Sequence, residues 1–251
     1  MLAAVILAGL VGLVLGSFLG VVADRLPRRK SVVSPGSHCT GCGQAVRPYD
    51  NIPVLSWLLL RGRCRHCAAP IPRRYPLTEA LTGALFAAVV IVKGADERAL
   101  GGLVLVILLV PVALIDLEHR IIPNRLLAPA AVLAVVIQAA VDLRALPEHL
   151  IAGAAALIFF GLAALAYPRG MGMGDVKLAG TLGLFLGGSV AVAVFVALVA
   201  GTLVGLAIIA RRGVAAGRKT AVPFGPFLAL GGIVGLLAGP PVVQAYLDAF
   251  T

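Results

Sequence analysis

Two aspartates lie where an apolar run meets a polar segment, and they are the strongest candidates for chemistry in this chain. Asp116 ends the apolar run at 103–115, and Asp175 follows the glycine-rich segment 170–174 and opens another apolar stretch. An ionisable group at such a boundary is costly unless it is solvated, paired or used. Two neighbouring carboxyl groups do not both ionise easily, so one acts as an acid while the other activates water. The pair therefore predicts hydrolysis of a peptide bond by an aspartyl dyad.

Each aspartate also has an ordinary structural interpretation. Asp116 could be a solvated acid at a helix end, and Asp175 could be the N-cap of the next helix. The catalytic interpretation gains from Gly172 and Gly174, which expose the backbone before Asp175 and would let a substrate strand approach closely. Lys177 could steady the dyad, but we expect it to contact lipid headgroups instead.

The four cysteines form two C-x2-C pairs, Cys39 with Cys42 and Cys64 with Cys67, separated by residues 43–63. This spacing predicts a tetrahedral Zn²⁺ site with two ligands from each tight turn. Four thiolates leave no position for water, so we expect the zinc to be structural. A short, proline-rich segment with little apolar core needs such a staple. Disulfide bonds are the alternative, and a cytoplasmic location disfavours them.

The apolar composition requires a membrane protein. The 251 residues are 60% hydrophobic, with a mean hydropathy of +1.03, and long apolar runs are typical of transmembrane helices. We predict an all-α polytopic membrane protein with about eight spans and a small cytoplasmic four-cysteine insertion. A seven-span alternative joins the sixth and seventh spans across Gly187-Gly188. The predicted spans lie near 2–22, 77–93, 99–115, 124–143, 149–167, 176–187, 189–210 and 224–247.

Three parts of the chain follow from this pattern. They are a first transmembrane helix at 1–22, a cytoplasmic zinc-binding module at 23–76 and a membrane-embedded peptidase core at 77–251. The first span lacks a small-residue cleavage site and is followed by basic residues, so we expect an uncleaved anchor.

The distribution of basic residues predicts the orientation. If 23–76 is cytoplasmic, then 18 of the 21 basic residues lie on that side, and only Lys93, Arg98 and Arg144 lie opposite. This asymmetry follows the positive-inside rule, and it places both aspartates at the cytoplasmic face and both termini outside. The net charge of +10 is therefore topological. We expect no nucleic-acid partner, because no basic stripe is interleaved with stacking aromatics.

Several segments together resemble the bacterial type IV prepilin peptidases, which are membrane aspartyl proteases with a GxGD motif. The catalytic motifs are matched by Ala113-Leu114-Ile115-Asp116 and Gly172-Met173-Gly174-Asp175. The remaining likeness covers nearly the whole chain, with matches at Gly16-Ser17-Phe18-Leu19, Arg25-Leu26-Pro27, Asn51-Ile52-Pro53, Ser56-Trp57, Arg61-Gly62-Arg63-Cys64, Arg74-Tyr75-Pro76-Leu77-Thr78-Glu79 and Pro223-Phe224-Gly225-Pro226-Phe227. Two positions depart from the family pattern, namely Gly20 for an asparagine and Asn124 for an aspartate.

The resemblance implies a substrate and a second activity. It implies cleavage of prepilin or pseudopilin leaders after a glycine at the cytoplasmic face of the inner membrane. It also implies N-methylation of the new terminus with S-adenosylmethionine. Near the junction of the zinc module with the second span, Gly62, Arg63 and Glu79 are candidate methyl-transfer residues, with Glu79 able to accept the amine proton. Whether the substrate serves a pilus, secretion or DNA uptake stays open, as does the oligomeric state.

Two other classes of function remain as alternatives. In a proton-coupled transporter, Asp116 and Asp175 would be relay acids, and such acids should lie deep within spans and face a cavity. Their positions at span ends favour the peptidase. In a zinc-mediated assembly factor, the dyad would do no chemistry.

Overall fold

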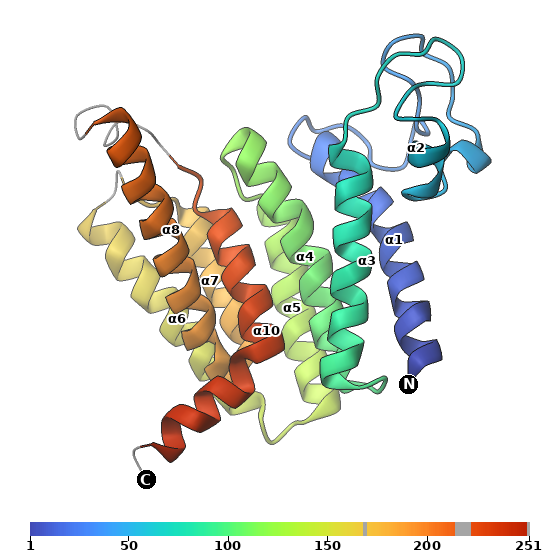
Figure 1. Cartoon of the computed structure of the whole chain (residues 1–251). Coiled ribbons are helices and arrows are strands. Elements are labelled where there is room, and N and C mark those ends of the chain that lie inside the picture. Colours follow the sequence, from blue (N-terminus) through green and yellow to red (C-terminus); the bar gives the residue numbers. More distant parts are fainter. Residues whose placement is uncertain (168–169, 214–221, 250–251) are drawn as a thin grey trace. The chain divides into compact units, whose positions relative to one another are not determined.

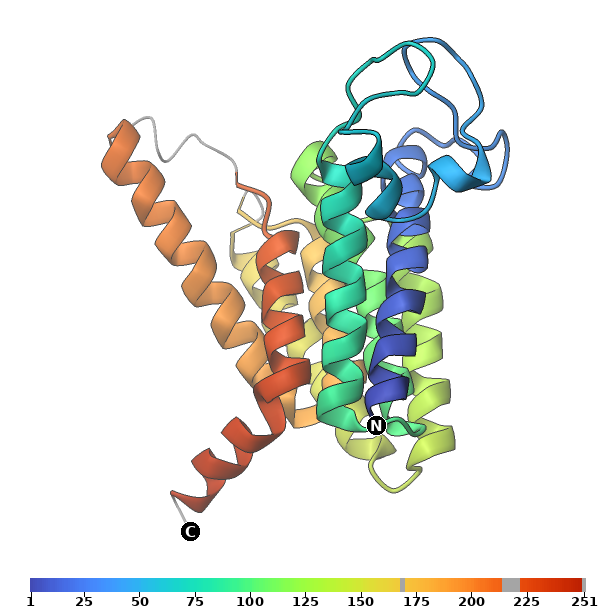
Figure 2. The same cartoon turned by 45° about the vertical axis from the view of Figure 1, so that its right-hand side comes forward.

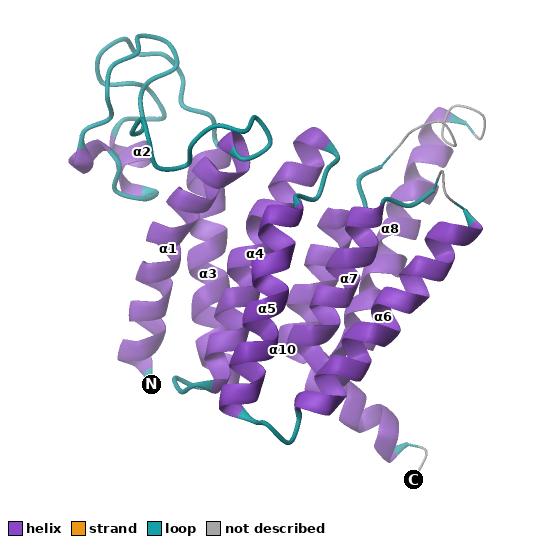
Figure 3. Cartoon of the chain, turned by 180° about the vertical axis from the view of Figure 1, so that it is seen from behind, coloured by secondary structure: helices purple, strands orange, loops and turns teal. Residues whose placement is uncertain are grey.

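The computed structural model describes residues 1–167, 170–213 and 222–249. It divides into two compact units, Met1–Asp96 and Glu97–Thr251. Within the described ranges every long element is a helix, and the remainder is loop and turn (Figure 3). The predicted all-α class is therefore confirmed.

Nine α-helices are described, and eight of them are long (Figure 1). These eight helices carry apolar side chains on all their faces. This is typical of membrane spans, whereas a helix on the surface of a soluble core has one apolar face. Prolines lie within these helices, such as Pro111 and Pro129, and membrane helices generally tolerate internal prolines. The helices are α1 (Leu2–Arg25), α2 (Leu55–Leu59), α3 (Arg74–Lys93), α4 (Arg98–His119), α5 (Asn124–Val141), α6 (Leu146–Ala166), α7 (Met173–Leu186), α8 (Val190–Arg212) and α10 (Gly225–Asp248).

Seven described stretches are long and apolar enough to cross a membrane, and one of them is the 40-residue stretch Met173–Arg212. This stretch is not one helix. Gly187 has φ 54° and ψ −138°, a backbone region essentially open only to glycine, and it ends α7. After the turn at Gly187–Ser189, α8 runs antiparallel to α7 (Figures 1 and 3). The chain therefore makes a tight turn at Gly187-Gly188, as the eight-span interpretation requires. The seven-span alternative needs one continuous helix there.

The end of α7 is tied to the beginning of α6. Glu148 Oε1 accepts a hydrogen bond of 2.9 Å from the Gly188 N–H. His149 Nδ1 donates to the Leu184 carbonyl oxygen at 2.9 Å, one of the carbonyls that a helix end leaves without a partner. With 14 residues, α7 spans about 21 Å, which is shorter than a typical hydrocarbon core of about 30 Å. These two bonds anchor the far end of a short helix.

Small residues bring α6 and α7 into close contact. A Cβ atom added to Gly183 would lie 2.6 Å from the Cα of Gly153, and one added to Gly180 would lie 3.1 Å from the Leu157 side chain. Helices in membranes associate through such close backbone approaches because lipid supplies no hydrophobic drive between them. The packing therefore sets the register of α7 against α6.

In the first unit, α1 and α3 lie side by side, and the polar segment folds over one end of the pair (Figure 2). Here too glycines form the contact, since a Cβ atom on Gly16 would meet the Cα of Glu79 at 2.8 Å, and one on Gly12 would meet the Thr82 carbonyl oxygen at 2.8 Å. The second span begins at Arg74, three residues earlier than predicted. The register of this pair determines where Glu79 meets the polar segment.

We expect Gly183→Leu to lower the free energy of unfolding by about 1–3 kcal/mol, because the added side chain overpacks the α6–α7 contact. Gly205→Leu is the matched control, since a Cβ atom at Gly205 meets no atom of the described residues within 4 Å. The measurement is the midpoint of thermal unfolding in detergent. Equal midpoints for the two variants would contradict the packing argument.

Candidate active site and metal centre

Asp116 lies in the last turn of α4 with only 5% of its surface exposed. The helix continues to His119, so Asp116 lies within the helix rather than just after a span that ends at 115. Its Oδ2 atom accepts a hydrogen bond of 2.9 Å from the Gly225 N–H. That N–H belongs to the first turn of α10, where backbone donors have no partner within the helix. The beginning of α10 thus holds the Asp116 carboxylate in place.

Asp175 lies in the first turn of α7, but it is not the N-cap, which is Gly172. Its Oδ1 atom is buried and has no hydrogen-bond partner among the described residues. The carboxyl groups of Asp116 and Asp175 are close enough to interact electrostatically. The structure therefore brings the two predicted acids, from α4 and α7, close enough to interact.

The segment 223–227 lies beside these acids, a placement that local sequence patterns could not reveal. A Cβ atom on Gly225 would lie 2.7 Å from Asp116 Oδ2, so the position has no room for a larger residue. The Phe224 ring packs against Phe160 of α6 and Phe227 of α10, with centroids 6.0 and 6.2 Å apart. These aromatic contacts hold the chain that presents Gly225 to the aspartate.

The two glycines before Asp175 differ in their surroundings. Gly172 is exposed, and a Cβ atom there would lie 3.3 Å from Asp175 Oδ2. A Cβ atom on Gly174 would instead meet Ile122 Cβ at 2.9 Å. Gly174 therefore makes room for the loop after α4, whereas substrate approach over Gly172 stays a prediction.

Lys177 has a partner within the protein. Its Nζ atom donates to Asn124 Oδ1 at 3.1 Å, which joins α7 to the beginning of α5. Lys177 thus contributes to helix packing rather than only facing lipid headgroups. The sequence comparison singled out Asn124, which stands where the family usually has an aspartate, but it did not predict this hydrogen bond.

The sulfur atoms of the four cysteines lie within 4.8 Å of one another and could hold a metal. The Cys39 and Cys67 sulfurs are 3.7 Å apart. Zinc–sulfur bonds of about 2.3 Å in a tetrahedron require sulfur separations of about 3.8 Å. The N–H groups of Cys42 and Gly41 lower the pKa of the Cys39 thiol to about 6, which favours the thiolate that a metal needs. The donor set therefore fits zinc, with Cys39, Cys42, Cys64 and Cys67 as ligands.

Both cysteine turns have the same backbone geometry. The Gly43 N–H donates to the Cys39 carbonyl at 2.9 Å, and the Ala68 N–H donates to the Cys64 carbonyl at 3.0 Å. Gly43 and Ala68 both have positive φ, at 71° and 57°. An alanine is uncommon in this region, so its presence indicates that the surrounding turn holds it there. Two matched turns presenting paired sulfurs are the geometry that the spacing predicted.

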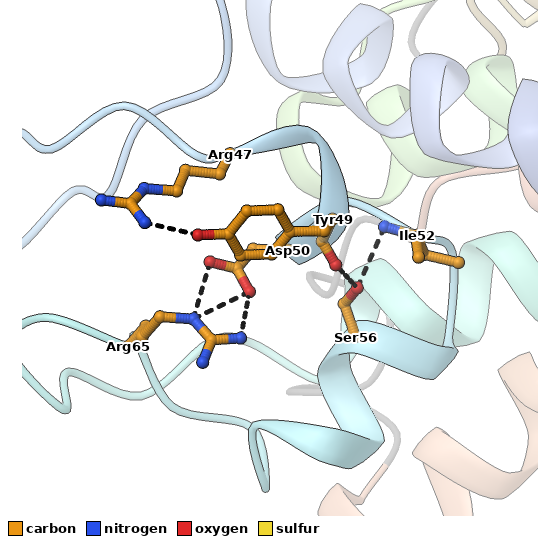
Figure 4. Close-up of polar contacts among 6 residues, drawn as sticks. All are labelled: Arg47, Tyr49, Asp50, Ile52, Ser56 and Arg65. Atoms are coloured by element: carbon orange, nitrogen blue, oxygen red, sulfur yellow. Dashed lines mark hydrogen bonds and ion pairs between the residues drawn. The ribbon is translucent and has the colours of Figure 1, made fainter.

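An ion pair joins the second cysteine turn to the segment before α2 (Figure 4). Arg65 Nε donates to both carboxylate oxygens of Asp50 at 3.0 Å. The Arg65 side chain lowers the pKa of Asp50, because it stabilises the charged carboxylate. The Tyr49 ring lies between Arg47 and Arg65, whose guanidinium carbons are 5.8 and 5.5 Å from its centroid. Ser56 Oγ donates to the Tyr49 carbonyl at 2.9 Å and extends the connection to α2.

A cavity of about 900 Å³ lies within the first unit, and Glu79 lines it. Glu79 is 8% exposed, and its Oε2 atom accepts a 2.7 Å hydrogen bond from the Val54 N–H. Gly62 and Arg63 do not line this cavity. Gly62 has φ 67° and packs against the Trp57 indole, where a Cβ atom would come within 2.8 Å, and Arg63 is exposed. Of the three candidate methyl-transfer residues, only Glu79 faces this space.

Comparison with known proteins identifies the family. A model of the bacterial peptidase A24 N-terminal domain matches residues 10–93, and a model of the type IV leader peptidase family matches residues 103–206. The chain belongs to the type IV leader peptidase family. The boundary between the two matches falls near the division between the two compact units at Asp96 and Glu97.

Relatives named prepilin leader peptidase/N-methyltransferase support this membership. The protein from Myxococcus xanthus is 41% identical over 70% of this chain and 54% of its own length. The protein from Burkholderia pseudomallei strain 1026b is 34% identical over 92% of this chain and 84% of its own length. The protein from Pseudomonas aeruginosa is 32% identical over 98% and 94%. No solved structure matches the chain.

In this leader peptidase, we expect Gly225→Ala to reduce leader cleavage about 100-fold, because the new methyl group displaces the Asp116 carboxylate from its position. Gly205→Ala, at a site with open space, is the control. Initial rates with saturating prepilin, measured alongside thermal unfolding, separate lost positioning from lost fold. A Gly225→Ala variant with the rate of the unaltered protein would contradict the assigned contact.

We expect about one zinc per chain in protein purified under reducing conditions. Cys64→Ser should loosen residues 31–76 more than the membrane helices, because metal binding is coupled to local folding. Metal analysis and limited proteolysis measure the two effects. Absence of zinc, or a Cys39–Cys42 disulfide in cells, would refute the metal site.

Proposed function

We propose that the protein is a membrane aspartyl endopeptidase that cleaves prepilin or pseudopilin leaders after a glycine, and then methylates the new N-terminus. The observation that carries the proposal is the pairing of Asp116 and Asp175 from two helices, with Asp175 Oδ1 buried and without a hydrogen-bond partner among the described residues. Membership of the type IV leader peptidase family and the names of the relatives support the substrate and the second activity.

In the proposed mechanism the two aspartates share one proton. The Gly225 N–H fixes Asp116, and Asp175 Oδ1 faces the reacting water. The ionised carboxylate takes a proton from this water, and the oxygen of the water attacks the scissile carbonyl carbon. The protonated carboxyl group then gives its proton to the leaving amine as the C–N bond breaks. Exposed Gly172 gives the extended substrate access to the acids.

The distribution of charge supports an active site at the cytoplasmic face of the inner membrane. Within the second unit, the end of α4, which carries Asp116, lies on the same side as the beginning of α7, which carries Asp175, and the end of α8 (Figures 1 and 3). The basic residues at this end include Arg120, Arg125, Lys177, Arg211 and Arg212, whereas the opposite end carries Arg98 and Arg144. The positive-inside rule then orients the protein, with both termini outside. Three further basic residues of the prediction, Arg169, Arg218 and Lys219, lie outside the described residues.

A proton-coupled transporter has no support from the family comparisons. Asp116 lies in the last turn of α4 and Asp175 in the first turn of α7. Relay acids are expected along a path through the spans rather than at their ends.

For the methyl transfer, we propose S-adenosylmethionine as the methyl donor and Glu79 as the acceptor of the amine proton. Methyl transfer needs a neutral amine. Glu79 lines a cavity whose wall also includes Cys39 and Cys64. Zinc at the four cysteines would have a structural role, because it would hold the loops that form the cavity wall.

Asp116→Asn and Asp175→Asn should each reduce leader cleavage by about 10²- to 10⁴-fold, because an amide cannot serve as the base or share the proton. Asp248→Asn, at the exposed end of α10, is the control. Cleavage of a purified prepilin is the measurement. Near-normal cleavage by either variant, with normal membrane insertion, would sink the mechanism.

Glu79→Gln and Cys64→Ser should impair methylation more than cleavage. The Gln side chain retains an oxygen that can accept from the Val54 N–H, so the local fold should persist while proton acceptance is lost. Mass spectrometry of the mature pilin measures methylation beside cleavage. Fully methylated pilin from Glu79→Gln would remove this residue from the reaction.

A further inference from the structure

We propose that the 900 Å³ cavity of the first unit is the binding site of the methyl donor, a nucleoside sulfonium with an amino-acid tail. The proposal rests on the methyl transfer proposed above and assigns residues to the donor. Cofactor sites are typically clefts of about 300–1,000 Å³ with a few polar groups on a largely apolar wall, so the size is suitable. The wall comes from α1, α2, α3 and the loops that the cysteine cluster holds.

A fixed aromatic ring offers a surface for the adenine base. Trp57 lines the cavity, and its Nε1 atom donates to the Ile71 carbonyl at 3.0 Å. The Gly62 backbone lies against the same indole, where a Cβ atom would come within 2.8 Å. These two contacts hold the ring in one orientation. Stacking on such a ring accepts any purine or pyrimidine, because every base has a π-face.

The cavity presents charges of both signs, which suits a ligand that itself carries charges of both signs. The charged lining consists of the acids Asp24, Asp50 and Glu79 and the basic residues Arg25, Arg28, Lys30, Arg65 and Arg74. The Asp24 carboxylate is oriented by Arg28 and Arg74, at 2.8 and 3.3 Å. The donor carries a sulfonium and an ammonium that carboxylates attract, and a carboxylate that arginine binds.

A strained residue orients the acid in this cavity. Val54 has φ 61° and ψ −50°, a conformation that is an outlier for a β-branched side chain. Its N–H donates to Glu79 Oε2 at 2.7 Å. Such strain persists where the surrounding structure enforces it, commonly at ligand sites. Because one Glu79 oxygen is engaged by Val54, the other oxygen is the one that can accept a proton from the cavity.

The chemistry balances with these residues. The neutral amine of the substrate attacks the methyl carbon, so a C–N bond forms as the C–S bond breaks. The electron pair of the broken bond goes to sulfur, which becomes a neutral thioether. The surplus proton on the methylated amine passes to Glu79. No oxidant, reductant or further reactant is needed.

The single tryptophan of the chain makes the assignment testable by a readout other than activity. The full-length protein in detergent is titrated with S-adenosylhomocysteine, the unreactive product. We expect saturable quenching of Trp57 fluorescence at the same concentrations at which equilibrium dialysis shows binding. Trp57→Phe should bind more weakly than the unaltered protein, because phenylalanine lacks the Nε1–H that orients the ring against the Ile71 carbonyl. It should lose the fluorescence signal.

Asp24→Asn should raise the dissociation constant about tenfold, because a charge-assisted contact is lost. Glu97→Gln, an exposed acid of the second unit, is the matched control and should bind like the unaltered protein. Binding without any change in Trp57 fluorescence, or equal affinity for Asp24→Asn, would overturn the cavity assignment even if mature pilin is methylated. If the protein neither binds S-adenosylhomocysteine nor methylates pilin, the proposed methyl-transfer activity is wrong, and the donor site is wrong with it.

Discussion

The hydrogen bond from the Gly225 N–H to the Asp116 carboxylate is the contact on which the candidate active site depends. A buried carboxylate is costly unless a donor satisfies it, and here the donor is a backbone group at a helix N-terminus. Because α10 also packs against α7 and α8, the same contact ties the position of Asp116 to three helices. Glycine at position 225 is required because any side chain would occupy the carboxylate site.

The second aspartate reaches the same place through a different constraint. Asp175 sits on a helix of 14 residues, so its position depends on how the far end of that helix is anchored. Glu148 and His149 supply the anchor at the turn, and the glycine contacts between α6 and α7 fix the register. Gly172 is exposed, and three residues later Asp175 has a buried carboxyl oxygen with no hydrogen-bond partner in the described part of the chain.

The first unit is stabilised differently. Its polar segment has too few apolar side chains to form a hydrophobic core of its own. The ion pair between Asp50 and Arg65 joins the loops of this segment, and the four clustered sulfurs could hold a metal in place of that core. The cost of burying Glu79 is offset by the Val54 N–H. The result is a preformed cavity whose wall carries aromatic, acidic and basic groups.

The sequence by itself determined the helical class, the four-cysteine segment and the two acids, because apolar runs, ligand spacing and isolated charges are local properties. Helix ends were less certain, and α4 continues to His119, where Arg120 in the left-handed conformation caps it by donating its N–H to the Asp116 carbonyl. Only the tertiary structure decided that Gly225 binds Asp116 and that Lys177 binds Asn124. These bonds join residues 109 and 53 positions apart, and such pairings depend on helix packing that no local pattern encodes.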